Sequence, residues 1–273
     1  MSVISIAQKR RGKFGESVYS GRSRVVLERS WIQFKSSTWI VVLSGFMEPL
    51  LNLVVFGYGV GAFVGNIELA DGRSVSYAAF VVPGLLASAA MMGAVMDATW
   101  NVFFKMHESR LYHAMLATSL GPLDVALGEI AWALLRGALY STTFMAVVTP
   151  LGLIKSWWGL LAIPAGVLIG FGFAAIGMAC TSYMTSFQHM GMINIVLLPF
   201  TLFSGSFFPL SILPHWLANI IYCTPLTQGI ELMRMCTLGT ISPDIFVHIS
   251  YFIIFIALGL FFTTKRLNAL FMK

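Results

Sequence analysis

The sequence predicts an all-α protein that crosses a membrane several times. Of its 273 residues, 58% are hydrophobic and only 10% are charged, whereas charged residues make up about 25% of an average soluble domain. Apolar stretches long enough to cross the hydrocarbon core as helices recur along the chain. We therefore expect a disordered tail over 1–20 and a single transmembrane domain over 21–273. The first apolar stretch begins only after Thr38, so no signal peptide is expected.

Six membrane spans are expected between residues 39 and 264. Thirteen of the 17 Lys and Arg residues lie before the first span, in the loop after the second or after the sixth. The positive-inside rule then places both termini in the cytoplasm, with the protein in the cytoplasmic membrane. The net charge of +6 suits anionic lipids and does not indicate nucleic-acid binding. The expected bounds of the spans are 39–63, 77–103, 123–151, 157–181, 190–208 and 245–264.

The segment before the first span has the pattern of an amphipathic helix over 21–38. Leu27, Trp31 and Phe34 fall on one stripe of such a helix, with basic and acidic residues to one side. A basic amphipathic helix next to a span favours a position in the inner interface of the membrane. A plain cytosolic extension of the first span is the alternative.

A second short helix is expected in the loop after the second span, over 103–118. One face of this helix holds Phe104, and Gly121 followed by Pro122 ends the helix. It is either a simple connection or a docking surface for a cytosolic partner. On the second interpretation the coupling residues are Lys105, His107, Glu108, Arg110 and Leu111, with Lys105, Glu108 and Arg110 exposed.

Four polar residues lie inside the expected spans: Glu48 and Asn52 in the first, and Glu129 and Arg136 in the third. An unpaired charge at such depth costs at least about 2.5 kcal/mol, so pairing, burial or water must compensate for it. The residues either form a structural ion pair between the first and third spans or line a polar pathway. Glu129 is expected to reach cytoplasmic water.

Cysteines and histidines indicate no further site. Cys223 and Cys236 lie close enough in sequence for a disulfide, but free thiols are the favoured interpretation because the chain has only three cysteines. The five histidines have no metal-ligand spacing, so no metal site is predicted. Convergent groups for an intramembrane enzyme are not recognisable either.

Residues 209–239 are apolar but too broken to form a span. Pro209 and Pro214 interrupt the backbone hydrogen bonding, and Pro225 opens a second helix that Gly239 ends. Two helices of about 10 and 14 residues are each too short to cross a core of about 30 Å. The segment is therefore expected to enter the outer leaflet and return as a gate. Its residues are Phe207, Phe208, Pro209, Pro214, Trp216, Pro225, Glu231 and Arg234.

Four stretches resemble one known family, the permease subunits of ABC-2 type exporters. They read MEPLLNLVVFGYGVG, FVVPGLLASAAMMGA, LATSLGPLDVALGEIAWALLR and LFSGSFFPLSILPHWL followed by TPL. The most similar branch is that of the lipo-oligosaccharide (nodulation factor) and daunorubicin-resistance permeases, and the resemblance runs from about Arg24 to Lys273. It implies the interfacial helix, the six spans, the coupling helix and the outer re-entrant pair.

The resemblance also implies a mechanism. The chain has no GxxxxGK[ST] phosphate loop, so it is expected not to be an enzyme, and a separate ABC ATPase subunit would bind ATP and Mg. Two permease chains, identical or paralogous, and two ATPases would together export a glycolipid, a lipo-oligosaccharide or a hydrophobic drug among membrane lipids. The alternative is an ion-coupled secondary transporter, which Glu48 and Arg136 fit only in part because the chain shows no internal repeat.

Overall fold

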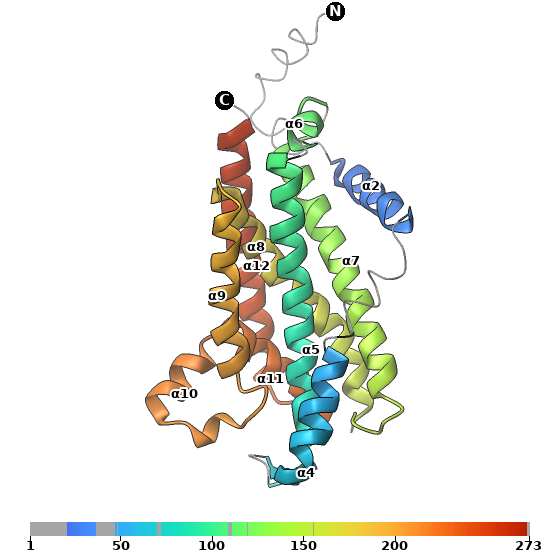
Figure 1. The fold of residues 1–273 in the computed structure, drawn as a ribbon, viewed down its shortest axis with the longest axis vertical. Helices are drawn as coiled ribbons and strands as arrows, with labels where there is room; N and C mark the ends of the chain where they lie inside the picture. Colours follow the sequence, from blue (N-terminus) through green and yellow to red (C-terminus); the bar gives the residue numbers. More distant parts are fainter. Residues whose placement is uncertain are drawn as a thin grey trace, which may run out of the picture.

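The computed structural model describes residues 21–36, 47, 49–69, 72–108, 111–118, 120–154 and 156–271. These residues form a bundle of upright helices (Figure 1). In the part of the chain that is described, four helices are long and apolar enough to cross a membrane: Tyr77–His107, Pro122–Val148, Trp157–Tyr183 and Ile245–Ala269. Two apolar helices are shorter, Pro49–Val64 and Gln188–Phe203.

The helical elements follow in one order along the chain, and three of them contain wide π-helical turns. The first half comprises α2 (Ser23–Ser36), η2 (Leu53–Val60), α4 (Gly61–Val64), α5 (Tyr77–Met96), η3 (Asp97–Asn101), η4 (Phe104–Glu108), α6 (Leu111–Leu116) and α7 (Pro122–Val148). The second half comprises η5 (Trp157–Leu161), α8 (Ala162–Tyr183), α9 (Gln188–Phe203), η6 (Leu210–Ile212), α10 (His215–Tyr222), α11 (Pro225–Leu238) and α12 (Ile245–Phe271).

Local sequence signals set the ends of several helices. The Ser76 hydroxyl accepts a hydrogen bond from the Ala79 amide at the start of α5. Pro122 occupies the first turn of α7, where its missing N–H costs nothing. Gly239 ends α11 with a left-handed backbone, φ 74°. The expected cap at Thr224 differs: its hydroxyl donates to the Ile221 carbonyl at 2.8 Å and caps no amide of α11.

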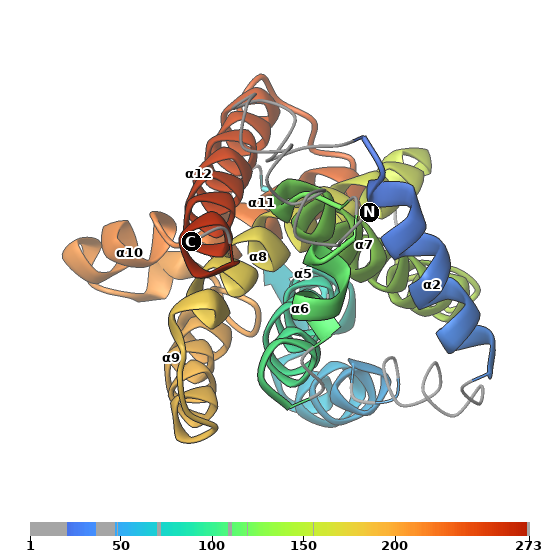
Figure 2. The ribbon, with the colours of Figure 1, turned by 90° about the horizontal axis from the view of Figure 1, so that it is seen from above.

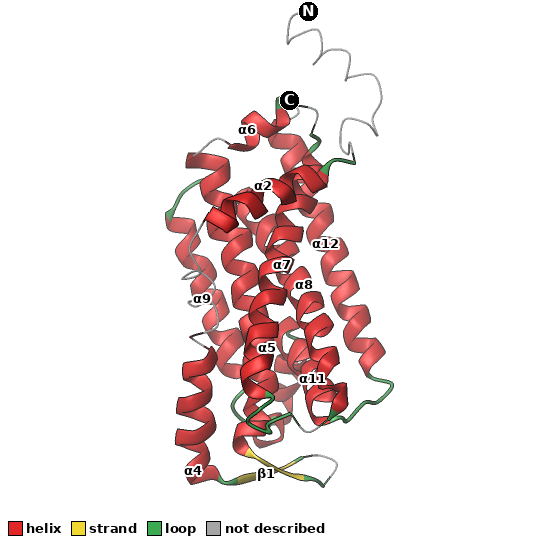
Figure 3. Cartoon of the chain, turned by 90° about the vertical axis from the view of Figure 1, so that its right-hand side faces the viewer, coloured by secondary structure: helices red, strands yellow, loops and turns green. Residues whose placement is uncertain are grey.

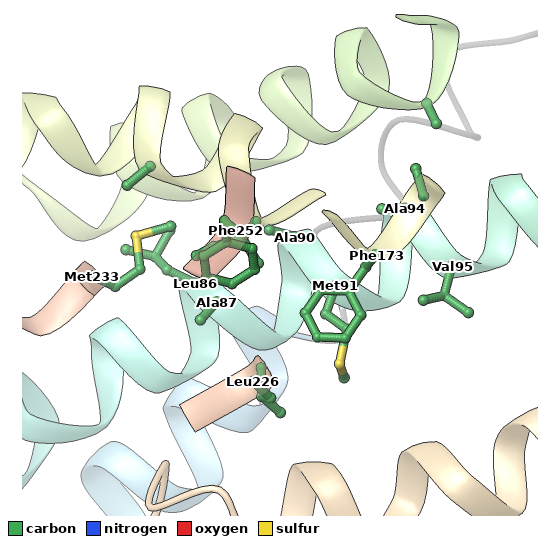
Figure 4. Packing of buried hydrophobic residues seen from close by; sticks show 14 of the residues in the cluster. Leu86, Ala87, Ala90, Met91, Ala94, Val95, Phe173, Leu226, Met233 and Phe252 are labelled. Atoms are coloured by element: carbon green, nitrogen blue, oxygen red, sulfur yellow. The ribbon is translucent and has the colours of Figure 1, made fainter. Parts of the chain in front are cut away.

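Helix α8 lies at the centre of the bundle, with α5, α7 and α12 packed around it. Phe173 of α8 and Phe252 of α12 meet the small residues of α5, with Leu226 and Met233 of α11 nearby (Figure 4). Close approach of α8 and α12 depends on Gly259, because a Cβ there would lie 2.7 Å from the Ala175 side chain. Small residues at such crossings allow the van der Waals contact that holds helices together in lipid.

Helix α2 lies across α7 near the end of the bundle where α12 finishes (Figure 1). Its buried residues are Val26, which is 1% exposed, and Ser30, which is 3% exposed. Trp31, expected on the buried stripe, is half-exposed and touches Trp132 edge-on. The buried stripe is therefore rotated by one residue from the predicted one, because Gly128 of α7 leaves space for Val26.

A small β-hairpin, which the sequence did not predict, covers the opposite end of the bundle (Figure 3). Strands β1 (Asn66–Glu68) and β2 (Ser74–Ser76) pair antiparallel, with Ile67 opposite Val75. The hairpin leads directly from α4 into α5. Its strands have three residues each, too short for a period-2 pattern to be recognised beside so many apolar helices.

The two helices expected between residues 209 and 239 are confirmed, but they lie in different surroundings. Helix α11 packs among α5, α8 and α12 and is mostly buried. Helix α10 projects sideways from the bundle (Figure 2), and its Trp216 is 66% exposed. Only α10 thus has the exposure expected of a segment lying in lipid.

Three expected boundaries were wrong. The second span continues past Phe103 to His107, so the separate cytoplasmic helix is only the short α6. The fifth ends at Phe203 instead of residue 208, where Ser204 and the left-handed Gly205 turn the chain. The sixth continues as helix to Phe271. The tail over 1–20 and the first part of the first span lie outside the described residues.

We predict that Gly128→Ala separates α2 from α7. An added Cβ would lie 2.4 Å from Val26 Cβ and 2.9 Å from the Ser23 carbonyl, and overpacking of this kind typically costs about 1–3 kcal/mol. Proteolysis of the purified protein within α2 should become faster, and the thermal stability should fall.

Gly137→Ala, in the same helix, is the matched control, because a Cβ at Gly137 has no atom within 4 Å. It should leave α2 protected and stabilise α7 by up to about 1 kcal/mol. Equal loss of stability in both variants would show that the contact with Val26 is unimportant.

Candidate functional site: a groove and two buried ion pairs

A groove of about 620 Å³ lies between the first apolar helix, α5, α7 and α9. Most of its wall is apolar, from residues such as Leu85, Met92 and Leu197. Asn52, a predicted polar site residue, lines the groove, as do Arg136 and Tyr140. Phe207 also lines it, and its ring lies 4.5 Å from that of Phe56. The groove thus has the mixed surface that an amphiphile requires.

Arg136 is held by two side chains. Its guanidinium donates to Asp97 Oδ1 at 2.5 Å and to the Tyr140 hydroxyl at 2.8 Å. The ion pair is largely buried, with 22% of the arginine and 8% of the aspartate side chain exposed. Asp97 lies in η3, so this bond joins the second and third spans. An ion pair buried in an apolar bundle is retained because loss of either partner leaves an uncompensated charge.

Lys105 and Glu129 form a second buried ion pair at 2.6 Å, with 8% and 3% of their side chains exposed. Two expectations were wrong here. Lys105 was expected on the exposed face of a cytoplasmic helix, but the π-helical turn η4 directs it inward, while Phe104 is 47% exposed. Glu129 was expected to reach cytoplasmic water, but it is only 4% exposed.

The short helix α6 is in electrostatic contact with this second pair. Its Tyr112 is fully buried, and burial raises the pKa of the phenol well above its usual value, with the Glu129 carboxylate adding to the shift. The phenol therefore stays neutral at physiological pH. Movement of α6 thus changes the surroundings of Glu129.

Other expected coupling residues are placed only in part. His107 is exposed and its ring stacks on Phe103 at 4.4 Å, and Leu111 packs against the core. Arg110 and Glu48 lie outside the described residues, as does the side chain of Glu108. The predicted pair of Glu48 with Arg136 therefore stays a prediction, and the carboxylate that contacts Arg136 in the structure is Asp97.

The expected outer gate residues gather around the turn between α9 and α10. Arg234 donates to Glu231 at 2.5 Å and to the Gly205 carbonyl at 3.0 Å, and it lies over the Phe80 ring. The Tyr77 hydroxyl donates to the Phe207 carbonyl at 2.9 Å. Pro209 and Pro214 precede η6 and α10, Pro225 begins α11, and Phe208 is half-buried.

Asp97 is the functional residue that sequence reasoning missed. It lies within the expected second span, so its charge inside an apolar stretch was a recognisable signal. The three cysteines are free, as expected: Cys180 and Cys223 are exposed and Cys236 is buried. Burial raises the pKa of Cys236 to about 11, so this thiol is unreactive.

Comparison with known proteins identifies relatives over most of the chain. The family of ABC-2 type transporters matches residues 22–238. Nodulation protein J of Rhizobium leguminosarum bv. trifolii is 32% identical over 245 residues, which are 89% of this chain and 91% of that protein. Nodulation protein J of Sinorhizobium fredii (strain NBRC 101917 / NGR234) is 30% identical with the same coverage. ABC transporter G family member 33 of Arabidopsis thaliana is 22% identical over 233 residues, 81% of this chain but 16% of that protein.

We predict strong energetic coupling between Asp97 and Arg136. Asp97→Leu and Arg136→Met should each lower the free energy of unfolding in mixed micelles by about 3–5 kcal/mol, because each leaves a buried charge unpaired. The double variant should be less destabilised than the sum of the two, since no orphan charge remains.

Arg24→Ala is the control, because the Arg24–Glu28 pair on α2 is 86% and 56% exposed and such pairs contribute about 1 kcal/mol or less. Strictly additive losses at Asp97 and Arg136 would contradict the buried pair.

Proposed function

Because the chain belongs to the ABC-2 type transporter family, we propose that it is the permease subunit of an ATP-driven exporter that moves an amphiphile outward across the cytoplasmic membrane. The observation that carries this proposal is the groove of about 620 Å³, whose apolar wall meets a fixed arginine. A hydrocarbon chain packs against the apolar wall, while the polar end of the same molecule stays near Arg136, Tyr140 and Asn52. The relatives named for nodulation support a lipid-linked saccharide as the cargo.

The energy source in this proposal is a separate ABC ATPase that binds ATP and Mg. We place its docking surface on α2 and α6, which lie at the same end of the bundle (Figure 1). Between them lies an apolar cavity of about 310 Å³ lined by Val25, Leu111 and Met115, with Arg29 at its edge. An apolar side chain of the ATPase fits this cavity.

Movement at that surface has a direct route to the groove. Tyr112 of α6 lies near Glu129, Glu129 holds Lys105, and the helix that carries Lys105 also carries Asp97. Asp97 in turn holds Arg136 in the groove. Closure of the ATPases would therefore reach the polar end of the cargo through two buried ion pairs.

A second permease chain, identical or paralogous, belongs to the same proposal. The faces available to it or to lipid are apolar: Ile195 of α9 is 71% exposed, and Phe63 of α4 is 93% exposed. Exposed apolar surface on this scale marks a contact with protein or membrane.

We predict that Ala114→Glu, on the exposed side of α6, abolishes co-purification of the ATPase with the tagged chain from native membranes. A buried carboxylate at this contact would have no partner, so binding should fall at least about tenfold. Export should stop, while the amount of inserted protein stays unchanged.

Asn219→Glu on α10, at the other end of the bundle, is the control and should leave ATPase binding intact. Undiminished ATPase binding by Ala114→Glu would exclude α6 as the docking surface. Export that continues without ATP would exclude the proposed energy source.

The membrane orientation is tested by thiol labelling. In a chain from which Cys180, Cys223 and Cys236 have been removed, single cysteines at Ile212 and Ile241, which are 72% and 40% exposed, should both react with an impermeant reagent from outside. A cysteine at Ala114 should react only after permeabilisation. Reaction of Ile241 from the cytoplasmic side alone would show that residues 209–239 cross the membrane.

A further inference from the structure

A second cavity lies on the other side of Arg136, beneath α2. It has a volume of about 320 Å³ and is lined by residues of α2, of the second span and of α7. Arg136 and Met96 border both this cavity and the groove. The two spaces therefore adjoin along the bundle, with the Asp97–Arg136 pair between them. The volume lies within the roughly 300–1,000 Å³ of small-molecule sites.

Three residues in the wall of this cavity carry buried polar atoms that lack a hydrogen-bond partner among the described residues. They are Ser30 Oγ, Asp97 Oδ2 and Arg136 Nε. More than 90% of buried polar groups in proteins are paired, so three unpaired atoms around one cavity indicate a missing ligand. Together they offer a carboxylate acceptor, a guanidinium donor and a hydroxyl that does both.

The rest of the wall restricts the chemistry of that ligand. Trp100 and Trp132 provide aromatic surface, and Asn101 adds an amide. The cations in the wall, Lys105 and Arg136, are each paired with a carboxylate. An anionic group would therefore meet the free oxygen of Asp97 without an uncompensated cation, which disfavours a phosphate. A sugar ring has hydroxyls for the polar atoms and an apolar C–H face for the aromatic rings.

We propose that this cavity binds the uncharged sugar head of an amphiphile whose hydrocarbon chain lies in the adjoining groove. This inference deepens the proposed function, on which it rests, by naming the class of head group and its position. Asp97 and Arg136 then have two roles, because the pair that stabilises the bundle also contributes the unpaired oxygen and N–H at the junction of the two spaces.

The test is equilibrium binding of radiolabelled octyl glucoside, below its micellar concentration, to the full chain in lipid nanodiscs without ATPase or ATP. We expect saturable binding that octyl phosphate, which has the same chain, displaces at least tenfold less well. Ser30→Ala should weaken binding about fivefold, as expected for one hydrogen bond. The protein should still fold, because the removed hydroxyl has no partner in the structure.

Ser141→Ala is the matched control, because Ser141 also carries a buried hydroxyl without a partner among the described residues but lines neither space. It should bind octyl glucoside like the unaltered chain. Trp100→Leu should weaken binding about tenfold, and Trp158→Leu, at an exposed site elsewhere, should not.

Equal binding by the Ser30 and Ser141 variants would overturn the proposal, as would displacement by octyl phosphate as effective as that by unlabelled octyl glucoside. Absence of saturable binding would show that the cavity holds only water. Because ATPase co-purification and ATP-dependent export are measured separately, a chain that keeps both but fails to bind the glucoside refutes this site alone and leaves the exporter function standing.

Discussion

The ion pair between Asp97 and Arg136 is the interaction on which the arrangement of this bundle depends. Two charges within apolar helices are tolerated only in contact with each other, since either alone would be an unpaired charge away from water. Their 2.5 Å contact therefore fixes the second span against the third. Lys105 and Glu129 repeat this connection between the same two helices. Two separate attachments define both the rotation and the vertical position of one helix relative to the other.

At the opposite end, the same constraint is met with neutral groups. The chain leaves α9 through Ser204 and the left-handed Gly205, where helical backbone bonds are lost. Thr227 donates to the Ser204 carbonyl and Arg234 to the Gly205 carbonyl. Irregular backbone at this depth persists because protein groups replace the missing bonds. The turn that begins the outer segment is thus held by α11, which follows it in the chain.

Composition and proline positions were sufficient to predict the class of fold, most of the helices and the two short helices after residue 209. These properties depend on local chemistry and on the length of apolar runs. The side-chain partners were not predictable in this way. Lys105 was assigned to an exposed face because an α-helical period was assumed, whereas η3 and η4 have wider turns. Asp97 was overlooked although its charge was visible, and Arg136 was paired instead with Glu48, which the structure does not describe.

The wide turns of η3 and η4 have a consequence for how this region can vary. Each π-helical turn contains one residue more than an α-helical turn closed by the same bond, and it rotates everything that follows. Asp97 and Lys105 therefore reach their partners on α7 only at the present spacing. Removing one residue between them would restore regular pitch, yet it would turn the lysine away from Glu129. Evolution can change the identity of the exposed side chains here, such as Phe104, more freely than the number of residues, so insertions and deletions should be rarer in this stretch than substitutions.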